Sequence, residues 1–378
     1  MQQTQFDYFW TKGNGKSFAD WAKHNPTTSS DGKYDAFFLE HDDQTDLLVS
    51  NSLKDKSFHL AMRSLSEENG LKNLPDNFKS LAEEVSTLPT WLDQELIQSG
   101  VELSQRAGLN GLLILRNFSL LGGYYFSNLT KPLVVTGALE KGATHRLYNT
   151  LQFWSDVSRS GESGNTERIQ ASLKIRLIHA ASRILILEKN PTWDMQKLGY
   201  PINIADMIAT NIAFTLYFLY GLEKLGFQFS EKEEAGIFHL WKYVTWLLGV
   251  PAELIPNNRT EAVDYLHYWT SKQNGPDEDS VKLAKALLKE NTQVDILKVD
   301  FVKRNIGFIH KSIANYLIDQ QTREALQIPI IPFKGFFPNV IKIKNRFFLF
   351  DDRNKQIIRG NEEQLSVLAD YRKAVKKD

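Results

Sequence analysis

Residues Lys174–Leu187 have the sequence KIRLIHAASRILIL, which reads as one nearly apolar helix with a few charged side chains. On a helix that turns ~100° per residue, Arg176, His179 and Arg183 share one face. Leucine, isoleucine and alanine fill most of the remaining circumference, so the helix is expected to be buried. The polar stripe must then face a partner inside the protein, because a buried guanidinium without an anion is very costly.

The composition is that of a globular protein with one large domain or two ordinary ones. The chain has 378 residues, of which 42% are hydrophobic and 24% are charged. Its 45 basic and 45 acidic residues balance, which argues against a nucleic-acid partner because such proteins normally carry a basic excess. The absence of cysteine excludes disulfides, cysteine-ligated metals and covalent haem attachment through a C-x-x-C-H motif.

The chain shows no sequence signal for export or for a membrane span. Its start, MQQTQFDYFWTKGNGK, lacks a basic segment followed by an apolar run, so no signal peptide is predicted. The longest apolar run, Met207–Leu222, has 16 residues, whereas a membrane span needs about 20. We therefore expect this run to be a core helix and the protein to be cytoplasmic.

The residue patterns predict a mainly α-helical bundle in three parts. Residues 1–84 are expected to form an extended, aromatic-containing arm followed by helices that pack on the core. Residues 85–275 are expected to form a helical core around a ligand pocket, and residues 276–378 to add C-terminal helices to the same globule.

The sequence changes in character after Ile328, where proline and glycine become frequent. Isoleucine and lysine alternate over Ile341–Lys344, and an alternation of apolar and charged residues is typical of a β-strand with one buried face. We therefore expect a short β-hairpin near residues 338–352.

Two short motifs suggest ligand sites but have simpler interpretations. Gly13–Ser17 (GNGKS) resembles the end of a phosphate-binding loop, but that pattern needs a glycine where this chain has Trp10. His41–Asp46 (HDDQTD) contains metal-ligand residue types, but no second ligand cluster is evident. We interpret this second motif as a solvated turn.

Two neighbouring helices carry polar stripes like that of the opening helix. In THRLYNT, Arg146, Asn149 and Thr150 fall at positions i, i+3 and i+4. In INIADMIATNIAF, Asp206 and Thr210 lie on one face, and large apolar residues occupy the others. Three mostly apolar helices with one polar stripe each are typical of the lining of a pocket inside a bundle.

The polar stripes have two possible explanations, and the residues alone leave both open. Buried polar groups usually pair internally, for example Asp206 with an arginine and His179 with a threonine or a backbone carbonyl. The three stripes, however, contain three arginines and one aspartate, so an additional anion would balance the charge. Haem fits because it brings two propionates and accepts an axial imidazole, and a phosphorylated ligand would also fit the charge.

Between residues 85 and 250 the chain carries, in order, the motifs LPTWLD, TGAL, HRLYNT, IRLIHAASR and PINIADMIAT. In order and spacing this set resembles the MpaB/latex-clearing-protein oxygenase family. The resemblance implies an α-helical protein that binds haem b without covalent attachment. It also implies an oxygenase, because rubber-cleaving members use dioxygen to cleave carbon–carbon double bonds of isoprenoid chains.

The resemblance assigns His179 as the proximal ligand of the haem iron. Arg176 and Arg183 flank this ligand and would suit either the propionates or a structural carboxylate. Asp206 and Thr210 complete the predicted set of cofactor-binding residues from the third stripe.

On the other side of the haem, Arg146 and Thr150 match the family's R-x-x-x-T pair, and Asn149 completes the candidate catalytic residues. Asn149 stands where the rubber-cleaving branch has a lysine. The segment SNLTKP lacks the glutamate that serves as the proposed base in that branch. These departures make polyisoprene an unexpected substrate and place the distal chemistry in question.

The leading hypothesis is a haem b-dependent oxygenase that acts with dioxygen on a small apolar or isoprenoid-like alkene. Two alternatives remain. The first is a haem protein of another class, either peroxidase-like or a haem or gas binder without turnover. The second is a cofactor-free helical binding protein whose polar stripes form internal ion pairs.

Overall fold

The computed structural model describes residues 3–27, 34–137, 139, 142–161, 163–293, 300–348 and 351–376. The described residues form helices and contain no strand, which confirms the mainly α fold class. Short 3₁₀ turns aside, the helices are α1 (Gln3–Thr11), α2 (Asn14–Ala22), α3 (Asp43–Lys54), α4 (Ser57–Ser64), α5 (Asp76–Ser86), α6 (Gln94–Arg106), α7 (Gly108–Ile114), the π-helix η3 (Leu115–Leu120), α8 (Leu121–Gly123), α9 (Ser127–Val135), α10 (Gly142–Val157), α11 (Gly164–Lys189), α12 (Met195–Leu198), α13 (Ile204–Phe214), α14 (Leu216–Lys224), α15 (Glu231–Leu247), α16 (Arg259–Ser271), α17 (Glu278–Gln293), α18 (Asp300–Leu317), α19 (Gln320–Ala325), α20 (Phe336–Phe348) and α21 (Arg353–Val375).

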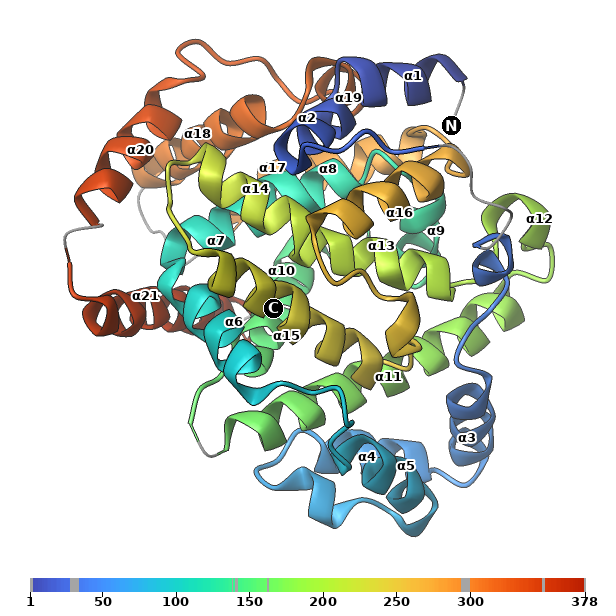
Figure 1. Cartoon of the computed structure of the whole chain (residues 1–378). Coiled ribbons are helices and arrows are strands. Elements are labelled where there is room, and N and C mark those ends of the chain that lie inside the picture. Colours follow the sequence, from blue (N-terminus) through green and yellow to red (C-terminus); the bar gives the residue numbers. More distant parts are fainter. Residues whose placement is uncertain are drawn as a thin grey trace.

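The N-terminal arm is helical, so the expectation of an extended arm is wrong. Helices α1 and α2 pack against α16, on the opposite side of the molecule from α3, α4 and α5 (Figure 1). The indole Nε1 of Trp10 donates to Thr270 Oγ1 at 2.9 Å, and the ring of Phe6 lies 5.0 Å from that of His267. Phe6, Phe9 and Trp10 recur at the spacing of one helical face, and packing of this face on α16 favours a helix over an extended chain.

Helix α11 is the longest helix described, with 26 residues, and it runs across the molecule between α15 and the layer of α3 and α5 (Figure 1). Helices α6 and α15 pack closely through two glycines. A Cβ atom on Gly100 would lie 2.2 Å from the carbonyl oxygen of Gly236, so a larger residue would force these helices apart. The interior of the bundle thus depends on close helix contacts.

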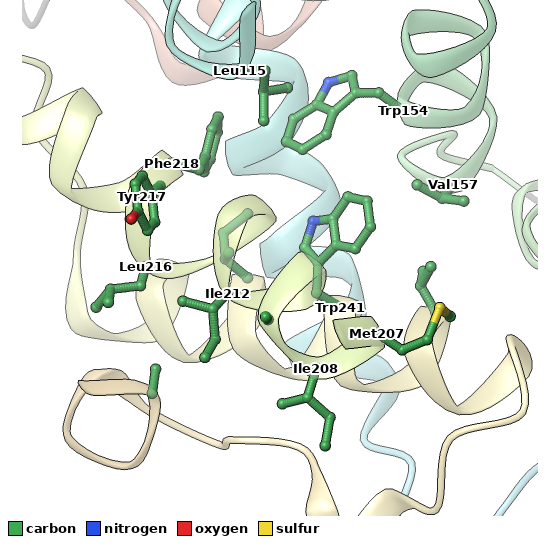
Figure 2. Close-up of a cluster of buried hydrophobic side chains, with 14 of the residues drawn as sticks. Leu115, Trp154, Val157, Met207, Ile208, Ile212, Leu216, Tyr217, Phe218 and Trp241 are labelled. Atoms are coloured by element: carbon green, nitrogen blue, oxygen red, sulfur yellow. The ribbon is translucent and has the colours of Figure 1, made fainter. Parts of the chain in front are cut away.

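The centre of the core is a group of stacked aromatic side chains contributed by different helices. The rings of Phe214 and Trp241 lie 4.1 Å apart and are nearly parallel, and Trp154 stacks on Trp241 at 5.7 Å. Trp154, Trp241 and Phe218 surround the same apolar space as Ile212 (Figure 2). This cluster joins α10, α13, α14 and α15 into one core, because large aromatic side chains bury much apolar area.

The most apolar segment is buried in the protein. Residues Ile204–Lys224 are long and apolar enough to cross a membrane, and among the described residues they alone meet this criterion. However, 83% of their most apolar window is buried inside the protein. The backbone also breaks at Thr215, where φ is −110° and ψ is −80°, which separates α13 from α14. The burial supports the expected core helix.

The predicted hairpin near residues 338–352 is wrong, because its first part forms α20. Within α20, Pro338 and Asn345 are buried and Phe337, Ile341 and Lys342 are partly buried, and this i, i+1, i+4, i+5, i+8 spacing is helical. Asn345 Nδ2 donates to the carbonyl oxygen of Leu225 at 2.8 Å, which fixes the helix on α14. Residues 349 and 350 lie outside the described residues.

Candidate functional site

The polar stripe of α11 faces the segment that leads into α3. Arg176 Nε donates to Asp42 Oδ2 at 2.6 Å, and its second amino group reaches Asp42 Oδ1 at 3.1 Å. Arg183 Nε lies 2.8 Å and 2.9 Å from the two oxygens of Asp46, and its NH2 group lies 2.5 Å from Oδ1. Both guanidinium groups are therefore held by bidentate carboxylate contacts, which are the strongest ion-pair geometry.

These two contacts correct two predictions. The side chains of Asp42 and Asp46 are only 8% and 12% exposed, so the interpretation of His41–Asp46 as a solvated turn is wrong. The additional anion that the charge of the three stripes suggested is not needed by Arg176 and Arg183, because Asp42 and Asp46 neutralise them. Of the two partners considered for these arginines, the structure shows the structural carboxylate.

Burial and charge act against each other at these carboxylates. Burial alone would raise the pKa of Asp42, but the hydrogen bonds and charge of Arg176 outweigh it and hold the pKa below its ordinary value. At Asp46 burial prevails over Arg183 and raises the pKa. Gly249 has φ of +94°, and a Cβ atom there would lie 2.5 Å from Asp42 Oδ2, so glycine makes room for the pair.

His179 lies at the edge of this stripe and has a different environment. Burial and the charge of Arg183 lower the pKa of His179 to about 3, so its imidazole is neutral at physiological pH. Its Nδ1 atom is buried and has no hydrogen-bond partner among the described residues, whereas Nε2 is not buried to that degree. Beside it on α11, Ile178 is 37% exposed and Ile175 is partly exposed. A neutral imidazole thus borders an apolar face that solvent can reach.

The stripe of α10 contains a cation without a carboxylate. Arg146 donates to the hydroxyl of Tyr124 at 2.9 Å and lies over its ring at 5.1 Å. No described acidic side chain lies within ion-pair distance of Arg146. Asn149 is exposed and Thr150 is partly buried, and neither hydrogen-bonds through its side chain within the part of the chain that the structure describes. These three polar groups therefore remain available to a ligand.

The polar stripe of α13 is buried at Asp206 and exposed to solvent at Thr210. Asp206 accepts hydrogen bonds from Trp269 Nε1 at 2.9 Å and from Asn203 Nδ2 at 3.1 Å. Burial raises the pKa of Asp206 to about 7, although these two donors oppose the shift. Thr210 donates to the backbone oxygen of Asp206 at 2.8 Å and is exposed, unlike Ala209 before it. The partners of Asp206 are thus an indole and an amide, not an arginine.

Helices α10 and α11 are consecutive, and the contact near the turn between them sets their register. Arg168 Nε donates to the carbonyl oxygen of Val157 at 2.7 Å. Arg146 and His179 lie the same number of residues from this contact, about 16 Å along each helix at the usual helical rise. The two stripes therefore lie at the same level of the bundle.

Two pockets lie away from His179. One, of about 610 Å³, is lined by residues of α9, α12 and the loop before α17, including Lys131, Trp193 and Asp277. The other, of about 530 Å³, lies beside the Arg176–Asp42 pair. Neither is lined by His179. Within the described residues, no group of three or more histidine and acidic side chains is placed to hold a metal ion.

Sequence reasoning located the three stripes but missed several of their partners. Asp42 and Asp46 are separated by one helical turn, and this i, i+4 spacing of acids at a helix start was the available signal. Tyr124 and Trp269, the partners of Arg146 and Asp206, were not among the predicted site residues. Each of these four partners is distant in the sequence from the residue that it contacts.

Comparison with known proteins gives three findings. Residues 112–336, more than half of the chain, match the family described as ER-bound oxygenase mpaB/B′/Rubber oxygenase, catalytic domain. A rubber oxygenase from Streptomyces sp. (strain K30) is 23% identical over 189 residues, which are 48% of this chain and 45% of that protein. The chain thus matches less than half the length of this curated relative.

The fold is similar to that of a solved structure. The structure of latex clearing protein LCP in the closed state superposes with a TM-score of 0.68 at 15% sequence identity. The match covers 88% of this chain and 91% of that one. It therefore extends well beyond the segment matched by the family, into the N-terminal and C-terminal helices.

Proposed function

The chain belongs to the family of ER-bound oxygenases mpaB/B′ and rubber oxygenases, and on that premise we propose that it is a haem b-dependent oxygenase. Its co-substrate would be dioxygen, and its substrate a small apolar, isoprenoid-like alkene. The observation that carries the proposal is His179, a neutral imidazole with an unpartnered buried Nδ1 beside an apolar face. The resemblance noted in the sequence implies the role of iron ligand for this same histidine.

The residues present fit a haem on three counts. An iron ligand must offer a free nitrogen lone pair, and His179 is neutral with no described hydrogen bond at either nitrogen. A porphyrin needs apolar contacts, which Ile175 and Ile178 on the same helix can supply. An oxygenase pocket needs a hydrogen-bond donor that no carboxylate occupies, and Arg146 has no described carboxylate partner.

Haem, when bound, would supply the iron that binds and activates dioxygen. The protein would hold the iron through His179 and exclude bulk water through the apolar side chains around it. Arg146, Asn149 and Thr150 would donate hydrogen bonds on the other side, and their positions on one stripe of α10 place all three donors together. Tyr124 holds the guanidinium of Arg146 by a hydrogen bond and a ring contact, which would orient this donor.

A cofactor-free helical binding protein is the second candidate, and one observation favours it. Asp42 and Asp46 neutralise Arg176 and Arg183, so these arginines do not require a bound anion. If the stripes were only structural, His179 would be a buried histidine without any ligand.

Absorption spectroscopy separates the two candidates. We expect protein produced with an adequate haem supply to show a Soret band, and we expect His179→Ala to lose it or shift it strongly. Added imidazole should restore a ligated spectrum in His179→Gly, because free imidazole can occupy the space of the deleted side chain. His59→Ala is the matched control, because His59 is exposed and should not affect the spectrum.

A wild-type protein without a Soret band that also fails to bind added hemin would contradict the haem proposal and support the cofactor-free candidate. An unchanged spectrum in His179→Ala would show that another residue holds the iron. Oxygen uptake with terpenoid alkenes then tests turnover. Haem binding without alkene-dependent uptake would identify a haem protein of another class.

A further inference from the structure

Helix α20 presents its apolar side to solvent. Phe336, Val340, Ile343 and Phe347 are 59%, 46%, 58% and 70% exposed. At ~100° per residue these four side chains fall within an arc of about 60°. They form one continuous apolar face along the helix, which we call the outer face of α20. Outward-facing apolar side chains arranged in this way are uncommon on a protein that has no partner for them.

The helix is attached to the protein by its other side. Asn345 is buried and bonds to the carbonyl oxygen of Leu225, and Pro338 and Ile341 lie on the same inner side. Lys342 bonds to the hydroxyl of Tyr316. Figure 1 shows α20 at the periphery of the molecule, and the exposure of the four apolar side chains shows that the outer face points away from the bundle. The orientation therefore follows from specific contacts of the inner side.

The preceding loop extends the same apolar surface. Ile330 and Phe333 are 72% and 83% exposed, the highest values among the large apolar residues described. Of the exposed large apolar side chains described, every phenylalanine lies between Phe333 and Phe347. The exposure is thus concentrated in one segment of the chain.

The charges of this segment are all positive. Residues 328–348 contain Lys334, Lys342, Lys344 and Arg346 and no acidic residue. Lys344 and Arg346 lie at ~80–90° on either side of the outer face, and both are exposed. Lys344 has one distant acidic neighbour, Glu363 at 3.9 Å. Cations thus border the apolar side chains along both edges.

From this arrangement we propose that α20 and the loop before it bind to the surface of an anionic lipid bilayer. The helix lies in the plane of the interface, the outer face enters the region between headgroups and acyl chains, and Lys344 and Arg346 contact lipid phosphates. The positive charge selects this partner over a second copy of the chain, because two such faces would bring like charges together. The binding is peripheral and needs no membrane span.

Vesicle co-sedimentation with the full chain tests the proposal. We expect binding to phosphatidylcholine vesicles that contain phosphatidylglycerol and at least about tenfold weaker binding to phosphatidylcholine alone. Phe336→Ser combined with Phe347→Ser should weaken binding by about 100-fold or more, because both rings would no longer enter the bilayer. Lys344→Glu combined with Arg346→Glu should remove the preference for anionic lipid, because these two cations border the outer face.

Leu47→Ser combined with Leu60→Ser is the matched control, since both leucines are exposed on other helices and their loss should leave binding unchanged. A Phe347→Trp variant gives an independent measurement, because its fluorescence should shift to shorter wavelength on anionic vesicles. The proposal is overturned if wild type binds neither vesicle, or if the control loses as much binding as the phenylalanine variant. It is also overturned if light scattering shows a dimer that the phenylalanine variant abolishes.

Discussion

Helices α11 and α20 both break the usual pattern of amphipathic helices, but in opposite directions. Helix α11 turns charged side chains towards the interior, and Arg176 and Arg183 are 7% and 4% exposed. Helix α20 turns apolar side chains towards solvent, with Phe347 70% exposed. The difference lies in the residues that face each helix. Asp42 and Asp46 contact the arginines of α11, whereas no described residue covers the outer face of α20.

The comparison shows when an unusual side chain indicates a ligand. A polar residue on a buried helix can be satisfied by a distant part of the same chain, as Asp46 satisfies Arg183 across 137 positions of the sequence. An apolar face on the outside of the protein cannot be buried by its own chain once the other side of the helix packs on the core. Variants of the two helices test whether the arginines of α11 depend on their internal carboxylates and whether the outer face of α20 is free of contacts within the protein.

The largest effect is expected from removing the partner of a buried arginine. Asp46→Ala leaves Arg183 buried without an anion, and we expect the free energy of unfolding to fall by about 3–5 kcal/mol. Urea denaturation at neutral pH measures this change.

Two matched variants show the origin of that cost. Asp43→Ala, in the same helix but exposed, should cost well under ~1 kcal/mol. Asp46→Leu combined with Arg183→Met should recover most of the stability lost in Asp46→Ala, because an apolar pair leaves no unpaired charge. If Asp46→Ala lowered the free energy of unfolding no more than Asp43→Ala, Arg183 would have a partner other than Asp46. The polar stripe of α11 would then not depend on the carboxylates described.

A smaller, pH-dependent effect is expected at Asp206, which is buried without an ion partner. The pKa of Asp206 in the folded protein is about 7, against an ordinary value of 3.8. Between these two values the folded state holds a proton that the unfolded state has lost, so stability falls as the pH rises through this window. The fall is about 1.4 kcal/mol per pH unit, and it ends above about pH 7.

Asp206→Asn removes this titration while keeping an acceptor for Trp269. We expect the difference in unfolding free energy between wild type and Asp206→Asn to shift by about 2.5 kcal/mol in favour of the variant from pH 5 to pH 8. His179, whose lowered pKa gives stability the opposite slope, is common to both proteins and drops out of the difference. A difference that stays constant with pH would mean that Asp206 is ionised throughout and has an unrecognised cation nearby.

The sequence was sufficient to predict features that depend on local periodicity. The polar stripe and burial of α11 follow from residues within a few turns of one another, and the helix spans Gly164–Lys189. The family resemblance, carried by motifs around Arg146, His179 and Asp206, is confirmed by the match over residues 112–336. The roles of these three residues at a haem stay predictions.

What depends on distant partners could not be predicted. Arg176 and Asp42 are 134 positions apart, and the i, i+4 spacing of Asp42 and Asp46 could suggest a shared helix face but not which distant arginines that face would contact. The hairpin expectation failed for a related reason. Four alternating residues, Ile341–Lys344, fit a strand, but the burial of Pro338 and Asn345 beyond them decides for a helix.

The smallest effect on stability is expected on the outer face of α20, and it tests the other side of the comparison. Phe347→Ser should change the free energy of unfolding by no more than ~0.5 kcal/mol, because a side chain 70% exposed has little contact to lose. Ile341→Ser, on the inner side of the same helix, should cost about 1–2 kcal/mol and serves as the matched reference. Urea denaturation of the two variants measures both. Equal losses of unfolding free energy in the two variants would mean that the outer face is covered within the protein itself. Helix α20 would then be an ordinary buried helix and not a binding surface.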